Sequence, residues 1–347
     1  MNVYLASVLG APDDSPVVRA FRDLAARSGE RRHLLVDDPE AAGLILIVDL
    51  HLLADWRAAA LGRHPLRRRF PEKVLIYNER DEPWCVWPGL YASMPARCLD
   101  PRRQRAWPYY RVGADVVREP SFDGADLLFS FMGSPSHRCR RPLLSLSHPR
   151  ALVRDTRGFV FFDRGSDPVG HARQRSAYLD VLRRSKFVLC PRGRGTSSIR
   201  LYETMAAGRA PVIIADDWVA PDGPDWDTFA LRVPEAEAAS LPRRLEAMED
   251  EAADRGAAAA AAWDRCFAAP VMFDRMIDAG VGLIEAGAPL LGPRRGRRFA
   301  RLGAQHTLYR GRVAAARTAR RLGLLPGGPT PTPTPAPTPA PTEPAAV

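Results

Sequence analysis

The stretch CPRGRGTSSIRLYETMAAG, residues 190–208, joins two apolar segments and decides how the second half of this chain folds. The preceding run KFVLC, residues 186–190, is typical of a buried β-strand. Residues 199–207 place apolar side chains at helical spacing, and Gly208 followed by Pro211 marks the end of that helix. The intervening PRGRGTSS is therefore predicted to run from the carboxyl end of a strand to the N-terminus of a helix, where ligands bind in open α/β sheets.

The composition of this loop suits a pyrophosphate. A helix N-terminus presents unpaired N–H groups and a partial positive charge, glycine lets the backbone approach a ligand, and hydroxyl and guanidinium groups donate hydrogen bonds. The residues predicted to contact a nucleotide diphosphate are Arg192, Gly193, Gly195, Thr196, Ser197, Ser198 and Arg200. Glu203 lies one turn beyond Arg200 and is placed to accept both hydroxyls of a ribose. Two alternatives stay open: a glycine-rich loop without a ligand, and a surface ion pair between Arg200 and Glu203.

Length and composition indicate a globular chain. Its 347 residues, 46% of them hydrophobic, are enough for two domains of ordinary size. Strand-like runs alternate with helix-length segments, which predicts an α/β fold with mostly parallel strands. The sequence shows neither an apolar run long enough to span a bilayer nor a signal peptide. The five cysteines are scattered and the seven histidines show no metal-ligand spacing, so we expect no metal site.

A longer pattern around the loop resembles the exostosin family of glycosyltransferases. Residues 185–235 read SKFVLCPRGRGTSSIRLYETMAAGRAPVIIADDWVAPDGPDWDTFALRVPE. The family pattern has a strand ending in CPRG, S-x-R-x-x-E on a helix, a G-x-x-PVI strand, DDW, and an acid–Trp pair before a strand ending in VPE. The upstream stretches LIYNERDEPWCVWPGLYASM and LLFSFMGS, with the arginines that follow the latter, also look like bacterial members. The resemblance covers roughly residues 75–245.

The resemblance implies a fold and a reaction. The fold is GT-B, in which two Rossmann-like domains face each other across a cleft and the second holds the donor. The reaction is an inverting transfer from a nucleotide-diphosphate sugar, most often UDP-linked, to a hydroxyl of a glycan, lipid-linked or small-molecule acceptor. Arg200 then contacts the diphosphate and Glu203 the ribose. Three residues at the end of the next strand would border the nucleotide or sugar pocket, namely Asp216, Asp217 and Trp218.

A direct displacement at the anomeric carbon needs a base for the acceptor hydroxyl and positive charge for the departing UDP. The arginines and the helix terminus supply that charge without a metal, so we expect no cofactor. The base is expected on the cleft side of the first domain, and the candidates are Asp81, Glu79, Glu82 and Asp163. Asp81 is the first choice, although each of these carboxylates also fits the role of a loop cap or ion-pair partner.

Composition shifts along the chain predict four regions. Residues 1–120 form an acceptor-side domain, 121–290 a nucleotide-sugar domain, 291–325 a basic helical segment, and 326–347 a disordered Pro/Thr-rich tail. Residues 294–321 contain ten arginines and no acid, which equals the net charge of +10, so the rest of the chain is near neutral. The segment fits a basic amphipathic helix, and three roles stay open for it: contact with anionic lipid, a solvated helix, or packing on the acidic stretch 246–254. A nucleic-acid partner is not expected.

The sequence departs from animal exostosins because it shows no membrane anchor, no luminal disulfide pattern and no second transferase domain. We therefore expect a single-module, bacterial-style member that works in polysaccharide biosynthesis, in the cytoplasm or peripherally at the inner face of the membrane. The alternative is a non-catalytic exostosin-like protein that binds a sugar nucleotide or glycan and supports a partner transferase. The sequence does not set the sugar, the acceptor or the oligomeric state.

Overall fold

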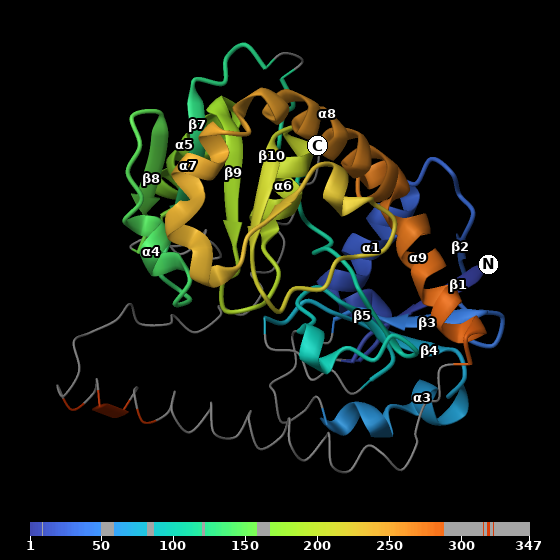
Figure 1. Ribbon diagram of the computed structural model, residues 1–347. Coiled ribbons are helices and arrows are strands. Elements are labelled where there is room, and N and C mark those ends of the chain that lie inside the picture. Colours follow the sequence, from blue (N-terminus) through green and yellow to red (C-terminus); the bar gives the residue numbers. More distant parts are fainter. Residues whose placement is uncertain are drawn as a thin grey trace, which may run out of the picture. The chain divides into compact units, whose positions relative to one another are not determined.

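The computed structural model describes residues 1–8, 10–49, 59–81, 87–119, 122–157 and 167–287, together with Ala315, Thr318, Ala319 and Leu322. The chain divides into two compact units, Met1–Pro293 and Arg294–Val347. The first unit contains two separate sheets of parallel strands (Figure 1). The base candidates Glu82 and Asp163, most of the basic segment and the whole tail lie outside the described residues.

The first sheet is formed by the N-terminal third of the chain in the order β2-β1-β3-β4-β5-β6. Its strands are β1 (Asn2–Ala6), β2 (Leu34–Leu35), β3 (Leu44–Ile47), β4 (Val74–Asn78), β5 (Gly89–Tyr91) and β6 (Gln104–Ala106). The helices of this region are α1 (Pro16–Ala26) and α3 (Pro65–Arg69). Every adjacent strand pair is parallel, and β3 and β4 are completely buried, as expected of apolar runs such as LILI and VLIYN.

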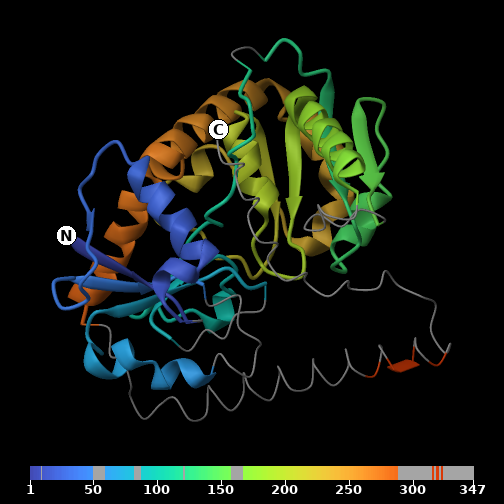
Figure 2. The same cartoon turned by 180° about the vertical axis from the view of Figure 1, so that it is seen from behind.

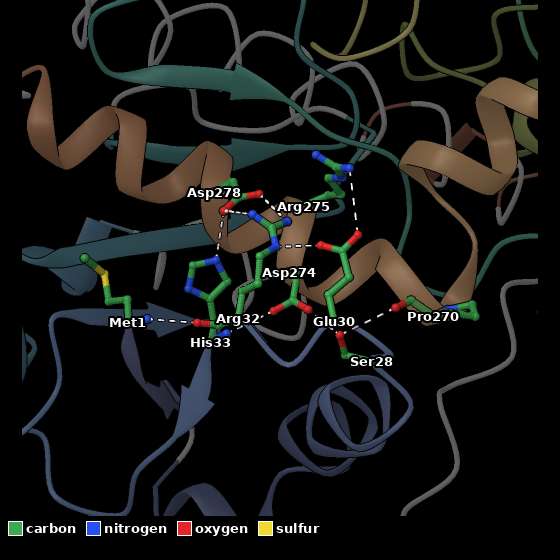
Figure 3. A network of polar contacts seen from close by, with 9 residues as sticks. All are labelled: Met1, Ser28, Glu30, Arg32, His33, Pro270, Asp274, Arg275 and Asp278. Carbon is green, nitrogen blue, oxygen red and sulfur yellow. Dashed lines mark hydrogen bonds and ion pairs between the residues drawn. The ribbon is translucent and has the colours of Figure 1, made fainter.

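The last long helix, α9 (Ala269–Glu285), returns to this first sheet and packs against α1 and β5 (Figure 2). A polar network fixes it there (Figure 3). Asp274 accepts hydrogen bonds from the Ser28 hydroxyl and from the backbone N–H of His33 (3.1 Å). Asp278 pairs with Arg32 (2.7 Å) and contacts His33 Nε2 (2.9 Å). The C-terminal helix is thus part of the core built around the N-terminal sheet.

The second sheet has the order β11-β10-β9-β7-β8. Its strands are β7 (Leu127–Gly133), β8 (Ala151–Asp155), β9 (Ser185–Pro191), β10 (Ala210–Ile214) and β11 (Leu231–Arg232). The helices around it are α4 (Arg140–Leu144), α5 (Pro168–Arg184), α6 (Ile199–Ala206), α7 (Leu241–Glu246) and α8 (Ala252–Cys266). Short 3-10 turns cover Pro12–Asp14, Ala59–Arg63, Ala96–Cys98, Trp226–Thr228, Glu235–Ser240 and Glu249–Glu251.

The two faces of this sheet bury different helices because successive strand side chains point to opposite faces. Val188 and Cys190 of β9 belong to a core shared with α5, α6 and α8, whereas Phe187 and Leu189 belong to a core shared with α4 and α7. The first of these cores also includes α1, α9 and strands of the first sheet, so one apolar cluster runs through both halves.

Both sheets have the same topology. The first strand of each lies between the second and the third, with β1 between β2 and β3, and β7 between β8 and β9. In open α/β sheets, ligands bind at this switch point, outside the carboxyl ends of the strands. The predicted α/β class and the two parallel sheets expected of a GT-B protein are confirmed, while the predicted domain limits stay a prediction.

Among the helices in the described part of the chain, none combines the length and the apolar character needed to cross a bilayer.

Candidate functional site at the carboxyl edge of the second sheet

The loop between β9 and α6 leaves the sheet at the switch point of the second half. Strand β9 ends at Pro191 and helix α6 begins at Ile199, as the sequence predicts. Ser198 is the N-cap residue in an extended conformation, but its side chain makes no capping hydrogen bond. Gly208 follows the helix with φ +67°, a left-handed conformation that favours glycine. The N-terminus of α6 therefore lacks a side-chain cap and points toward the loop.

A cluster of arginines gathers around this loop. Arg140, at the start of α4, donates to the carbonyls of Arg192 (2.8 Å), Pro191 (3.2 Å) and Ser134 (3.2 Å). Arg200 of α6 donates to the Met132 carbonyl and lies 4.9 Å from the centre of the Phe131 ring. These contacts hold both guanidinium groups beside the carboxyl ends of β7 and β9.

The cluster carries positive charge that the described residues do not neutralise. Among those residues, no carboxylate forms an ion pair with Arg140, Arg192, Arg194 or Arg200. The pKa of Arg140 is lowered to about 10, first because burial removes water and second because Arg200 is near. An anion bound here would relieve this repulsion, and phosphate matches the planar donors of arginine.

Two glycines allow close contacts that no side chain would permit. A Cβ on Gly193 would lie 3.1 Å from Arg140 Nη2. A Cβ on Gly195 would lie 2.1 Å from Ser93 Oγ and 2.8 Å from Asp81 Oδ1. Ser93 and Asp81 follow strands β5 and β4 of the first sheet, so Gly195 is a point at which the loops of the two sheets meet.

Further hydrogen bonds join the two sheets beside Gly195. The Thr196 hydroxyl donates to the Met94 carbonyl (3.1 Å), and the Ser197 N–H donates to Ser93 Oγ (3.3 Å). Both loop residues are buried. Their predicted phosphate contacts stay a prediction, and for Thr196 such a contact would require its hydroxyl to exchange the Met94 carbonyl for a phosphate oxygen.

Glu203 is enclosed by helix α5. It is 4% exposed, pairs with Arg175 (2.7 Å), and accepts a hydrogen bond from the Tyr178 hydroxyl (2.6 Å). Its partners are thus residues of α5 and not Arg200, which the surface-pair alternative required. Arg175 is itself held by Asp115 (2.6 Å). The predicted contact of Glu203 with a ribose stays a prediction.

The residues after β10 take different positions. Asp216 is exposed, and its Oδ1 accepts from the N–H of Glu235 (2.9 Å). Asp217 pairs with Arg97 of the first half. Trp218 is 8% exposed and packs edge-on against Trp226, with 5.0 Å between ring centres. The described contacts of Trp218 are therefore with protein, and its predicted role at a pocket is not tested by them.

Two of the four base candidates are described. Asp81 lies against Gly195, and its pKa is raised because surrounding protein excludes water, although Arg194 and Arg140 oppose that shift. Glu79 Oε1 accepts from the Tyr77 hydroxyl (2.8 Å) and from the Tyr110 N–H (2.9 Å). Burial raises the pKa of Glu79 to about 7. Of the two, Asp81 is the one beside the predicted donor loop.

Sequence analysis did not single out several residues at this edge. Arg140 belongs to the arginines that follow LLFSFMGS, and this basic run was its only signal. Ser93, whose Oγ lies 3.4 Å from the Tyr109 hydroxyl, belongs to a region that lacks periodicity. Asp49 is fully buried at the switch point of the first sheet and accepts from the Ser7 hydroxyl (2.6 Å). Its position directly after the LILIV strand could have identified it.

The loop and its sheet are similar in sequence to a family of known proteins. Residues 119–248 match the profile of the Exostosin GT47 domain. The Caenorhabditis elegans protein described as Exostosin-1 homolog is 41% identical over 73 residues, which is 20% of this chain and 19% of that protein. The Oryza sativa subsp. japonica protein described as Probable glucuronosyltransferase GUT1 is 31% identical over 143 residues, or 34% of each chain. The similarity thus spans about a fifth to a third of the length of these relatives.

A sucrose-phosphate synthase from Thermosynechococcus elongatus aligns with 82% of this chain and 99% of its own, with 13% sequence identity and a TM-score of 0.43. A likeness at this level says nothing about ligand or reaction. Residues 119–248 of this chain are thus similar to the Exostosin GT47 domain and to segments of these two relatives.

Proposed function

We propose that this protein is an inverting glycosyltransferase that moves a sugar from a nucleotide diphosphate, most simply UDP, to an acceptor hydroxyl. The observation that carries the proposal is the arginine cluster at the switch point of the second sheet, whose guanidinium groups form no ion pair with a carboxylate of the described residues. It lies within the residues that match the exostosin domain and meets Asp81 of the first sheet at Gly195. Charge for a leaving diphosphate and a carboxylate for an incoming hydroxyl are thus adjacent.

The reaction follows from these positions. The N-terminus of α6 with Arg192 and Arg200 binds the diphosphate and stabilises the negative charge that grows on it. The acceptor oxygen attacks the anomeric carbon from the opposite face, and its proton passes to Asp81. The bond from that carbon to the phosphate oxygen breaks as the new glycosidic bond forms, which inverts the configuration.

The proposal includes metal-independent transfer, because guanidinium groups replace the cation that would otherwise neutralise the leaving group. After treatment with a chelator, added Mg²⁺ or Mn²⁺ should leave the transfer rate unchanged. A rate that returns only with one of these ions would contradict this part of the proposal.

The acceptor and the location are inferred at a coarser level. A glycan or lipid-linked hydroxyl is the proposed acceptor, at the inner face of a membrane contacted by residues 294–321, and the proposed setting is polysaccharide biosynthesis in the cytoplasm. The argument for membrane contact is the charge of that segment, ten arginines without an acid.

The experiment compares donor binding with transfer. UDP release from a panel of UDP-sugars, beginning with UDP-glucuronic acid because of the rice relative's description, identifies the donor. Asp81→Asn should still bind UDP but lose transfer by about 10²–10⁴-fold, as for other acid–base groups. Glu79→Gln, Glu82→Gln and Asp163→Asn complete the set of base candidates.

Asp227→Asn is the matched control, since this side chain is 89% exposed and should not affect transfer. If all four candidate variants keep wild-type transfer, the base assignment is wrong. If the wild type binds UDP but transfers none of the sugars tested, the alternative of a non-catalytic binding protein takes precedence.

A further inference from the structure

Three potential metal ligands from two distant parts of the sequence meet beside the β9–α6 loop, residues 192–198. His137 Nδ1 lies 3.2 Å from Cys139 Sγ and 3.8 Å from Glu235 Oε2. All three ligand atoms lie within 4.8 Å of one another. Sequence analysis expected no metal because it considered spacings within single motifs, whereas His137 and Glu235 are almost a hundred residues apart.

The ligand types and distances fit one metal in particular. Imidazole nitrogen, thiolate sulfur and carboxylate oxygen are the usual ligands of Zn²⁺, which binds them tetrahedrally at about 2.0–2.3 Å. Two such ligands on a tetrahedral ion lie about 3.4–3.6 Å apart. The separations of 3.2 and 3.8 Å bracket that value, and the third, from Cys139 Sγ to the Glu235 carboxylate, is within 4.8 Å, so an adjustment of about 1 Å or less would close the site.

Burial and accessibility also suit a bound ion. Cys139 is 4% exposed, while the His137 side chain retains 24% exposure and leaves a path from solvent. Binding would release the thiol proton of Cys139 to solvent as the sulfur becomes a thiolate ligand. Thiolate and carboxylate together balance the two positive charges of zinc, so the neighbouring arginines would not oppose it.

The position of the cluster suggests what the ion would do. Cys139 directly precedes α4, whose Arg140 holds the carbonyls of Pro191 and Arg192. Glu235 Oε1 accepts a hydrogen bond from the Asp216 N–H (3.3 Å), and the Glu235 N–H donates to Asp216 Oδ1 (2.9 Å). An ion here would join the loop after β7 to the loop after β11, on either side of the β9–α6 loop.

We propose that His137, Cys139 and Glu235 bind a zinc ion, with water as the fourth ligand, and that the ion braces the outer side of the β9–α6 loop. None of the three ligand residues belongs to those assigned to the proposed metal-independent transfer, so the site is separate from it. It depends on the positions of the three side chains and not on the proposed transfer.

The test uses the full chain after dialysis against a chelator, titrated with Zn²⁺ in competition with a chromophoric chelator. One equivalent should bind, and Zn²⁺ should raise the thermal midpoint. Each of three variants, Cys139→Ser, His137→Gln and Glu235→Gln, removes a direct ligand of the ion. Each should weaken Zn²⁺ binding by at least about 10–100-fold, because loss of an outer-shell partner alone has an effect of that size. Cys266→Ser and His148→Gln are matched controls outside the cluster and should bind as the wild type does.

A second measurement guards against misfolded variants. Co²⁺ in place of Zn²⁺ should give a thiolate-to-metal absorption band in the wild type and none in Cys139→Ser, while both proteins melt cooperatively in chelator. The proposal is overturned if the wild type binds no equivalent of Zn²⁺, or if Cys139→Ser binds it unchanged. UDP binding measured in chelator reports separately on the donor site.

Discussion

Gly195 is the residue at which the loops of the two sheets come into contact. Any side chain there would overlap Ser93 Oγ and the carboxylate of Asp81, as the projected Cβ distances of 2.1 and 2.8 Å show. Gly195→Ala should therefore separate the two loops and reduce the free energy of unfolding by about 1–3 kcal/mol, the usual cost of overpacking. Chemical denaturation measures this change.

Gly282→Ala is the control for this prediction. Gly282 lies in helix α9, and a Cβ there meets nothing within 4 Å. Alanine should stabilise the helix by about 0.5–1 kcal/mol. Equal effects of the two substitutions would show that the close contact at Gly195 does not exist in solution.

Glu79 makes stability depend on pH. Its pKa is raised from 4.5 to about 7, chiefly by burial, although hydrogen bonds from Tyr110 and Tyr77 lower it. The folded state holds this proton more tightly than the unfolded chain does. The contribution to stability is therefore complete below pH 4.5 and is lost as the pH rises through 7.

Glu79→Gln keeps the accepting oxygen but cannot ionise. Between pH 5 and pH 8 the wild type should lose about 1–3 kcal/mol more stability than this variant, as a shift of this size implies. Urea unfolding at both pH values measures the difference. Parallel pH profiles of the two proteins would show that the Glu79 carboxyl is not held in its protonated form.

Only the site residues that belong to a local sequence motif could be predicted. Arg200 and Gly195 belong to the quoted stretch, and both lie at the predicted edge. The partners of Glu203, Arg175 and Tyr178, lie on another helix. No spacing in the sequence reveals such a pairing, because it depends on how α5 packs beside α6.

At the scale of elements, helix α9 is held by a buried carboxylate. Asp274 is fully buried and satisfies the Ser28 hydroxyl and the His33 N–H. Asp274→Ala leaves both donors unsatisfied and should reduce the free energy of unfolding by about 2–6 kcal/mol, from 1–3 kcal/mol for each of the two unpaired groups.

Asp278→Ala on the same helix is the comparison. Its side chain is 36% exposed, so loss of its ion pair with Arg32 should cost about 1 kcal/mol or less. Urea unfolding of both variants tests the docking of α9. If Asp278→Ala destabilises the protein more than Asp274→Ala, the buried hydrogen bonds of Asp274 do not contribute more to stability than the exposed ion pair of Asp278 in the network of Figure 3.

The sequence predicted the elements with strong periodicity and missed the others. The strands β9 and β10 and the helix α6 with its glycine end are confirmed. Strands β5 and β6 were missed because each has only three residues. Their sequences, GLY and QRA, are too short to show the apolar alternation of a strand. In the helical stretch near the C-terminus, the acidic 3-10 turn Glu249–Glu251 separates two helices, α7 and α8.

At the scale of the whole molecule, the first unit, Met1–Pro293, contains both sheets and the shared apolar core. A chain that ends at residue 293 should therefore unfold cooperatively at the same temperature as the full chain and bind UDP equally well. Calorimetry of both chains tests this. A large loss of stability in the shortened chain would show that the second unit contributes to the core.

The second unit contains the basic segment, for which membrane contact is proposed. In sedimentation with liposomes containing anionic lipid, the full chain should pellet and the chain ending at 293 should not. Liposomes of neutral lipid are the control, and salt should release the full chain. Equal sedimentation of both chains would place membrane contact elsewhere.

The most direct test of the central claim is calorimetric titration with UDP of the wild type, Arg200→Ala and Arg22→Ala. The account predicts that UDP binds and that Arg200→Ala weakens binding about 10–100-fold, as for loss of a charged hydrogen bond. Arg22 lies on α1 and pairs with Asp13. Arg22→Ala should therefore bind UDP as the wild type does. Absence of UDP binding, or unchanged binding by Arg200→Ala, would contradict the assignment of the β9–α6 loop as the donor site.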